Sequence, residues 1–356
     1  MLNVLTELYK IIYKYQRIDI RDLDIKRKIV RKSLYGVDVM SWAIGAAELR
    51  LWLQLIVESK FESKELKKEP LLPNLNMNIR IGDSIVQEIG GVSLHLRDCN
   101  ISEQMKKKLQ SLKEEKAKYF DNDSKYTKDE LLKEGIILFE EMVKERIDIL
   151  ESSNISTKQT TLFGLMLEDK SRETQKLKSN LSKLKETLLN ISDPEKRPFI
   201  WDIDFAEVFG EKGGFDIVIG NPPYVRHENI APPNKMKDEV TNEDKKEYKE
   251  RLIRSVKVHF PVIESLDKKS DYYIYFYFTG LSLLNKKGTF CFITSNSWLD
   301  VDYGKELQEF LLRYVPISAI YDSTNRVFEH AAVNTVIALF GAPDLGIKKS
   351  IDDFWR

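Results

Sequence analysis

The stretch Phe215-Asp216-Ile217-Val218-Ile219-Gly220-Asn221-Pro222-Pro223-Tyr224 decides the fold prediction for this chain. It begins as a short apolar run, typical of a buried parallel strand, and breaks at a glycine followed by a polar residue, two prolines and an aromatic. Open α/β sheets bind ligands beyond the carboxyl ends of their strands, so we predict a site at Asn221 to Tyr224. The prolines carry no backbone N–H, which leaves carbonyls and the Asn221 amide oxygen as acceptors for an amino-group substrate.

The tetrapeptide Asn221-Pro222-Pro223-Tyr224 resembles the catalytic motif of the adenine-N6 DNA methyltransferases that use S-adenosylmethionine (AdoMet). The resemblance implies that the target adenine is flipped out of double-stranded DNA, because its exocyclic nitrogen cannot be reached inside the stack. It also implies that the Asn221 side chain and the Pro222 carbonyl accept hydrogen bonds from the amino group, that Tyr224 stacks on the flipped ring, and that no metal takes part. The competing explanation is an ordinary strand-to-loop turn with a chance Pro-Pro.

Two other predicted strands end in an acidic residue. Asp38 ends the strand predicted for 34–39, where nucleotide-binding α/β folds place an acid that accepts hydrogen bonds from ribose. Asp83 ends the strand predicted for 78–85. With the neighbouring Leu-Arg-Leu-Trp-Leu and Arg-Ile-Gly-Asp-Ser segments, both resemble cofactor motifs of large restriction-modification methyltransferases, which implies that Asp83 contacts the AdoMet adenine. A strand-end turn or a helix cap also explains each acid taken alone.

The aromatic-rich sequence from Asp271 resembles the next motifs of the same family, a helix, a Lys-Gly turn and a strand. By this resemblance Asp271 lies near the cofactor, and Trp298 is a candidate for the substrate pocket. The segment Arg326-Val327-Phe328-Glu329 fits a late motif in which an aromatic packs on the other face of the flipped adenine. Phe328 is therefore the second stacking candidate, and a role in a hairpin core explains it equally well.

Apolar residues recur at helical spacing in the two N-terminal helices described next. The first helix carries an apolar stripe, and the helix after residue 40 carries apolar residues spaced four, three, four and three, which predicts one buried face. The stripe consists of Leu5, Leu8, Ile12 and Tyr15, and the second face consists of Trp42, Ala46, Leu49, Leu53 and Ile56.

Leucines between Lys and Glu in 101–192 repeat at alternating four and three spacing, as in a coiled-coil seam. We therefore predict three parts: 1–100 as the cofactor side of the methyltransferase domain, 101–192 as a helical insertion, and 193–356 as the side with the catalytic loop and target base. The charged stretch 226–268 is predicted as a long loop with one helix. The lysines of the insertion contact phosphate or form a solvated face.

AdoMet-binding sheets hold the cofactor over a glycine-rich turn after their first strand. No such turn precedes Asp38. The predicted fold is thus a Rossmann-like, class I AdoMet-dependent methyltransferase α/β sheet whose first, central strand is missing, which leaves unpaired backbone groups on its neighbours. The expectation is an N-terminally truncated fragment, with additional domains or a partner chain supplying the glycine-rich motif, target recognition and nuclease.

Composition adds little about function. The chain has 56 Lys and Arg against 56 Asp and Glu, so no net basic field indicates a nucleic-acid partner. Cys99 and Cys291 lack the spacing of metal ligands or of a redox pair. Because no segment has the profile of a signal peptide or membrane span, we expect a cytoplasmic protein without membrane contact. The family resemblance implies a prokaryotic protein.

The function expected from these observations is site-specific adenine-N6 methylation of DNA in a restriction-modification system. Two alternatives remain open. Protein glutamine N5 methyltransferases use the same loop to hold a side-chain amide, although they lack the surrounding cofactor segments found here. Without the glycine-rich turn, the chain is also explained as a non-catalytic DNA-binding or assembly module, an explanation that AdoMet binding would argue against.

Overall fold

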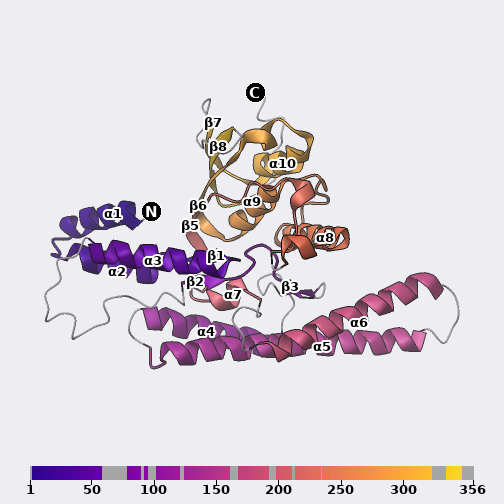
Figure 1. Cartoon of the computed structure of the whole chain (residues 1–356). Coiled ribbons are helices and arrows are strands. Elements are labelled where there is room, and N and C mark those ends of the chain that lie inside the picture. Colours follow the sequence, from indigo (N-terminus) through magenta and orange to yellow (C-terminus); the bar gives the residue numbers. More distant parts are fainter. Residues whose placement is uncertain are drawn as a thin grey trace.

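The computed structural model describes residues 2–57, 78–89, 92–94, 102–120, 124–160, 167–191, 198–210, 213–233, 235–322 and 334–346. Within these ranges the chain is an α/β structure that combines a mixed sheet with many helices. Figure 1 shows the C-terminal sheet and its helices in the upper part, the N-terminal helices to one side, and a layer of long helices below them.

The upper part is built on a mixed sheet whose strands follow the order β5-β6-β8-β7. β5 is parallel to β6, and β8 is antiparallel to both β6 and β7. β6 begins earlier than expected, because the predicted Lys-Gly turn is already part of the strand. The bounds are β5 (Phe215–Gly220), β6 (Leu284–Ser295), β7 (Ile317–Asp322), β8 (Thr335–Gly341), α8 (Asn242–His259), α9 (Tyr272–Ser282) and α10 (Lys305–Tyr314).

Aromatic side chains fill the core between this sheet and α9. The rings of Phe290 and Phe340 stack with centroids 5.8 Å apart, and Tyr277 packs on both. Gly280 of α9 lies against these rings, since a Cβ there would lie 2.7 Å from the Phe290 ring. The dense aromatic run after Asp271 is therefore mostly core.

The N-terminal part contains a second, smaller sheet. In it β1 (Gly36–Asp38) is parallel to β2 (Ile79–Ile81), and helices α1 (Leu2–Tyr15), α2 (Asp22–Lys32) and α3 (Ser41–Val57) pack beside it. The ring of Tyr35 lies 5.5 Å from that of Phe215, so β1 and β5 approach each other. Among the described residues, β1 and β5 are each hydrogen-bonded to a strand on one side only.

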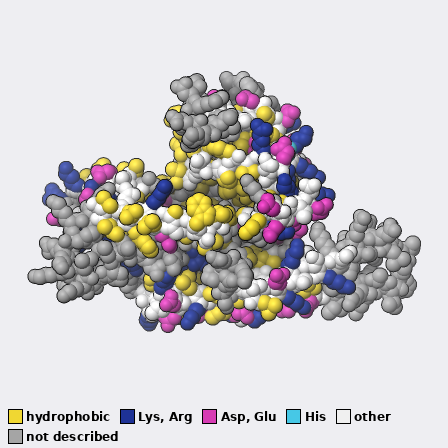
Figure 2. All heavy atoms as spheres, viewed as in Figure 1, with side chains coloured by type: hydrophobic (Ala, Val, Ile, Leu, Met, Phe, Trp, Pro, Cys, Tyr) yellow, Lys and Arg dark blue, Asp and Glu magenta, His cyan; other side chains and the backbone are white. Residues whose placement is uncertain are grey.

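The predicted buried face of α3 is wrong. On α3 the buried side carries Ile44 and Leu55, whereas Trp42 of the predicted face is 69% exposed. On α1 the buried residues are Leu2 and Thr6. Both helices are apolar on more than one side, so their spacing does not identify the side that has a partner. The exposed members of the α1 stripe and of the predicted α3 face are Leu8, Ile12, Tyr15, Trp42, Ala46, Leu49 and Leu53, and Figure 2 shows hydrophobic side chains gathered over this region.

Residues 101–192 are helical where the structure describes them, as predicted. They form α4 (Glu103–Phe120), α5 (Lys128–Thr160) and α6 (Leu167–Leu189), and Leu109, Leu112 and Leu184 are buried between them. α7 (Trp201–Asp204) lies between these helices and the sheets (Figure 1). The buried Lys116 ammonium of α4 donates to the backbone carbonyls of Ile203 and Asp204 at 2.9 and 2.7 Å, which fastens the insertion to α7. The division of the chain into three parts stays a prediction.

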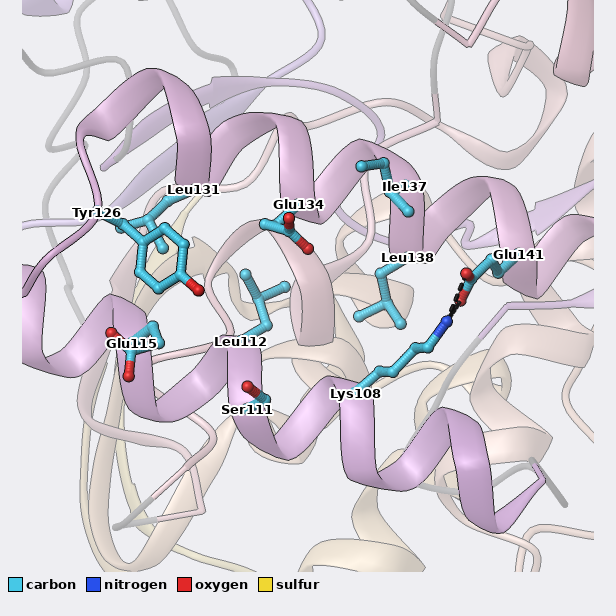
Figure 3. A pocket seen from close by; sticks show the side chains of 10 residues that line it. All are labelled: Lys108, Ser111, Leu112, Glu115, Tyr126, Leu131, Glu134, Ile137, Leu138 and Glu141. Carbon is cyan, nitrogen blue, oxygen red and sulfur yellow. Dashed lines mark hydrogen bonds and ion pairs between the residues drawn. The ribbon is translucent and has the colours of Figure 1, made fainter.

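A groove of about 160 Å³ lies between α4 and α5 (Figure 3). Its wall includes Leu112 and Leu138, and the Lys108 ammonium lies 2.7 Å from a carboxylate oxygen of Glu141 across it. These residues all belong to the insertion and its connecting turn, so the groove is separate from the strand ends where the sequence predicts a site.

The described stretch after the loop Asn221 to Tyr224 contains more structure than the predicted loop with one helix. Two short 3-10 turns, at His227–Asn229 and Lys237–Glu239, precede α8. α8 begins with a capping box in which Thr241 and Asp244 satisfy each other's backbone N–H groups. The small hairpin β3 (Glu88–Ile89) and β4 (Val92–Ser93) is joined to α8 by the Glu88–Arg254 ion pair at 2.8 Å.

Neither a membrane-spanning helix nor a metal site is found in the part of the chain that the structure describes. None of its helices is long and apolar enough to cross a membrane. In the same residues, no group of three His, Cys, Asp or Glu side chains is arranged to hold a metal ion.

Candidate active site at the carboxyl ends of the strands

The loop Asn221 to Tyr224 directly follows β5, as predicted. Gly220 ends the strand where a Cβ would lie 2.8 Å from the Phe292 ring, so the chain leaves the sheet close to β6. Asn221 and Pro223 are exposed, whereas Pro222 is buried. The Asn221 amide is thus presented at the surface on a loop whose next residue is anchored.

Tyr224 is half-buried and fixed to the neighbouring strand. Its hydroxyl donates to the Ile293 carbonyl of β6 over 3.3 Å. Burial raises the pKa of the Tyr224 phenol, which keeps the hydroxyl protonated as a donor. The bond holds the ring by its hydroxyl edge.

Hydrogen bonds also fix the backbone directly after Tyr224. The Tyr272 N–H donates to the Val225 carbonyl at 2.9 Å, and the His227 N–H donates to Asp271 Oδ1 at 3.0 Å. Asp271 Oδ2 accepts from the Tyr303 hydroxyl at 2.9 Å. Both carboxylate oxygens of Asp271 therefore bond to protein groups.

Asp83 follows β2 and is held by a hydrogen-bond network. Its Oδ1 accepts from the backbone N–H groups of Ile85 and Val86 at 2.9 and 3.0 Å. Its Oδ2 accepts from the Tyr248 hydroxyl at 2.7 Å, and that hydroxyl lies 2.9 Å from the Tyr272 hydroxyl. Burial, and then the neighbouring Asp83 charge, raise the Tyr248 pKa well above its usual value, so Tyr248 stays a neutral donor.

A cavity of about 1010 Å³ opens beside Asp83. Val39 and Ile81 supply aliphatic wall, Phe199 and Tyr248 supply aromatic wall, and Asp83 supplies a carboxylate. Gly82 is required at its edge, because a Cβ there would lie 2.1 Å from the Phe199 Cβ. The cavity thus combines apolar surface and the fixed Asp83 carboxylate with other charged side chains of both signs, namely Glu88, Lys183, Glu186, Lys235, Asp244, Glu247 and Arg251.

Asp38 lies next to this cavity in sequence, one residue before Val39. It is exposed, and its Oδ1 accepts from the Met40 N–H at 2.8 Å, the strand-end turn that the sequence left open. The network of Tyr248 and Tyr272 joins Asp83 to the start of α9, where Asp271 lies. Trp298 is fully buried in the core. Phe328 lies outside the described residues.

The sequence did not single out Tyr248 and Tyr303, which connect these groups. Tyr248 begins an apolar stripe with Leu252 and Val256, spaced four residues apart in a charged helix, and this spacing was a usable signal. Tyr303 lies in a short 3-10 turn, Asp302–Gly304, without periodicity. No local pattern indicates that it meets Asp271.

Two proteins described below are similar to part of this chain. A protein of Methanocaldococcus jannaschii, provisionally assigned as a type II restriction enzyme and methyltransferase, is 29% identical over 255 residues, 63% of this chain and 20% of that protein. The type II methyltransferase M.BstVI of Geobacillus stearothermophilus is 29% identical over 123 residues, 35% of this chain and 18% of that protein. The matched part of the chain spans no more than 20% of either relative.

A solved structure and a protein family also match the chain. The structure is a nuclease-deletion mutant of the Type ISP restriction-modification enzyme LlaGI in complex with a DNA substrate mimic. The match has 12% sequence identity and a TM-score of 0.41, and it covers 98% of this chain and 20% of that one. The Eco57I restriction-modification methylase family matches residues 32–328, well over half of the chain. This range includes Asp38, Asp83, the Asn221 loop and Asp271. The chain therefore belongs to the Eco57I restriction-modification methylase family.

Proposed function

We propose that this chain is the methyl-transfer region of a site-specific DNA methyltransferase, which methylates the N6 amino group of a flipped adenine in double-stranded DNA as part of a restriction-modification system. The observation that carries the proposal is the Asn221 loop. It follows β5 in a chain of a methylase family, with Asn221 exposed and its neighbours Pro222 and Tyr224 anchored. Such a loop offers acceptors to an amino group without having to reorganise.

In this proposal the chain's own residues orient the target. The Asn221 side-chain oxygen and the Pro222 carbonyl accept hydrogen bonds from the amino group and draw its lone pair toward the attack direction. Pro223 restricts the backbone of the loop. Tyr224 stacks on one face of the flipped adenine, and Phe328 is proposed for the other face. Base stacking of this kind contributes about 1 to 3 kcal/mol per base.

We propose AdoMet as the cofactor, which supplies an electrophilic methyl group when bound. The cavity beside Asp83 supports this choice, because its volume of about 1010 Å³ and its aliphatic, aromatic and carboxylate walls suit a nucleoside-containing ligand. Asp83 would accept from the adenine amino group and Asp38 from the ribose hydroxyls. Asp38 and Asp83 each accept a backbone N–H at Oδ1, which fixes the direction of the carboxylate. Oδ2 of Asp83 keeps a second lone pair beside the bond that it accepts from Tyr248.

We further propose that another segment, on the same polypeptide or on a partner chain, supplies a strand that pairs with β5 and β1 and carries a glycine-rich cofactor motif. Ile217 and Ile219 of β5 are each 55% exposed, although parallel strands are normally covered on both faces. The free edges of β1 and β5 suit strand addition. Target recognition and nuclease domains would also lie outside this chain.

The same free edges favour a second candidate function, a non-catalytic module that binds DNA or assembles with other chains. Calorimetric titration of AdoMet into the complete protein, which includes the segment proposed to carry the glycine-rich motif, separates the two candidates. A methyl-transfer region binds AdoMet, and Asp83→Ala and Asp38→Ala weaken that binding. A non-catalytic module shows no heat of AdoMet binding in either the wild type or the variants.

Transfer of a labelled methyl group from AdoMet to DNA tests the proposed function in the complete protein. We expect Asn221→Ala to abolish transfer and to leave AdoMet binding intact, because Asn221 contacts only the target amino group. Asn229→Ala is the matched control, since Asn229 is exposed in the same loop region. Near-normal turnover by Asn221→Ala would show that the role assigned to Asn221 is wrong. Labelling of protein glutamine instead of DNA would identify the other class of methyltransferase.

A further inference from the structure

The start of α9 has an unusual arrangement. Asp271 occupies the N-cap position of α9, but its side chain does not cap its own helix. An N-cap carboxylate normally accepts from the second or third N–H of its helix. Here Oδ1 instead accepts from His227 N–H at 3.0 Å and Oδ2 accepts from the Tyr303 hydroxyl at 2.9 Å.

These bonds connect three segments that are distant in sequence. His227 begins the 3-10 turn after the Asn221 loop, and Asp271 is the N-cap residue of α9. Tyr303 lies in the second 3-10 turn after β6. The Tyr303 hydroxyl is also 3.1 Å from that of Tyr273. Burial raises the pKa of Tyr303, which keeps its hydroxyl protonated and able to donate.

The tetrapeptide Asn221 to Tyr224 is therefore held at both ends. At its start, pairing of β5 with β6 continues to Gly220, opposite Phe292. At its end, the Tyr272 N–H bonds the Val225 carbonyl at 2.9 Å, and Asp271 bonds the His227 N–H. The second bond involves a carboxylate, and bonds to charged acceptors are about twice as strong as neutral ones.

We propose that Asp271 is a positioning residue for the Asn221 loop, acting through the His227 N–H and oriented by Tyr303. This inference rests on the proposed function and replaces contact with the cofactor as the role of Asp271. The carboxylate fixes where the backbone continues after Tyr224 and so fixes the direction of the Asn221 amide. Displacement of a reactive group by about 1 Å can cost about 100-fold in rate.

Substitutions at Asp271 separate the effect of its two hydrogen bonds from the effect of its negative charge. Asp271→Asn keeps an oxygen for the His227 N–H, and its amide N–H can donate to the Tyr303 oxygen, so both bonds survive without the charge. Asp271→Ala loses both bonds. Tyr303→Phe removes only the bond that orients the carboxylate. Asp302→Ala is the matched control, because Asp302 is exposed beside Tyr303.

The test measures amide hydrogen exchange over 221–229, AdoMet affinity and kcat in the complete protein. For Asp271→Ala we expect about tenfold faster exchange in this segment, the factor that corresponds to one lost hydrogen bond. We expect kcat to fall by about 10- to 100-fold at saturating AdoMet, with AdoMet affinity unchanged. Asp271→Asn should have the exchange rate of the wild type and most of its kcat. Tyr303→Phe should give values between those of Asp271→Ala and the wild type, and Asp302→Ala should match the wild type.

Two results would overturn the inference. Unchanged exchange in Asp271→Ala would mean that the carboxylate does not hold the loop. Weaker AdoMet binding with normal kcat at saturation would mean that Asp271 acts on the cofactor. Failure of the proposed function is a separate outcome, seen as absence of methyl transfer by the wild type, and the exchange comparison still decides whether Asp271 holds the loop.

Discussion

At the scale of single residues, the candidate site consists of groups fixed by others. Asn221 is exposed between a strand end and a bonded backbone, and Asp83 has three hydrogen-bond donors around it. Fixing of this kind is needed where a side chain must select one orientation of a small polar group. The partners Tyr224, Tyr248 and Tyr303 supply it through hydroxyls that burial keeps protonated.

Tyr224 allows stacking and anchoring to be tested separately. Tyr224→Phe keeps the ring but loses the bond to the Ile293 carbonyl, so we expect a small decrease in DNA affinity. Tyr224→Ala loses the ring, and because stacking contributes about 1 to 3 kcal/mol per base, the Kd for DNA should rise by about 10- to 100-fold. Equilibrium binding to a duplex with an abasic site opposite the target measures this. Equal affinities of the Ala and Phe variants would contradict a stacking role.

Tyr248 allows the network around Asp83 to be tested. Tyr248→Phe removes the hydroxyl that joins Asp83 to Tyr272. We expect the free energy of unfolding to fall by about 1 to 3 kcal/mol, because buried polar groups lose their hydrogen-bond partner. We also expect AdoMet affinity to fall, because the Asp83 carboxylate loses the bond that fixes its direction. Urea denaturation and calorimetry measure the two effects. Tyr126→Phe, at an exposed tyrosine of the insertion, serves as the control.

At the scale of elements, the sequence predicts where helices and strands lie better than it predicts which of their faces are buried. The β5 strand, the Asn221 loop and the helices of the insertion are found where their patterns indicate. The buried face of α3 is not found where its pattern indicates, because this helix has apolar residues on several sides and burial depends on which neighbour is present. Tyr303 meets Asp271 only through the tertiary fold, 32 residues away, so no local pattern could indicate the contact.

Alanine substitution of Gly220 tests the packing around β5, and Gly45 of α3 serves as the comparison. A Cβ at Gly220 would lie 2.8 Å from the Phe292 ring, so Gly220→Ala should destabilise the fold by about 1 to 3 kcal/mol through overpacking. At Gly45 of α3 no atom lies within 4 Å of such a Cβ. Gly45→Ala should therefore stabilise the chain by about 0.5 to 1 kcal/mol, the helix preference for alanine. Urea unfolding compares the two variants, and similar effects at both positions would contradict the packing described at Gly220.

At the scale of the whole molecule, the exposed apolar face of β5 supports the proposal that another segment covers it. The double variant Ile217→Thr, Ile219→Thr should change the unfolding free energy of this chain by less than about 1 kcal/mol, because both side chains are already half exposed. In the complete protein the same variant should lower AdoMet affinity and methyl transfer. The control is Ile317→Thr, Ile320→Thr on β7, the opposite edge of the sheet. An equal loss in both variants would argue against an added strand at β5.

The central claim is that the Asn221 loop directs methylation of adenine N6, and analysis of the reaction product tests it most directly. Unmethylated DNA is incubated with the complete protein and labelled AdoMet, digested to nucleosides and resolved by mass spectrometry. The account predicts N6-methyladenine as the labelled product of the wild type and of Asn229→Ala, and no labelled product of Asn221→Ala. A different methylated nucleoside, or N6-methyladenine formed equally by Asn221→Ala, would contradict it.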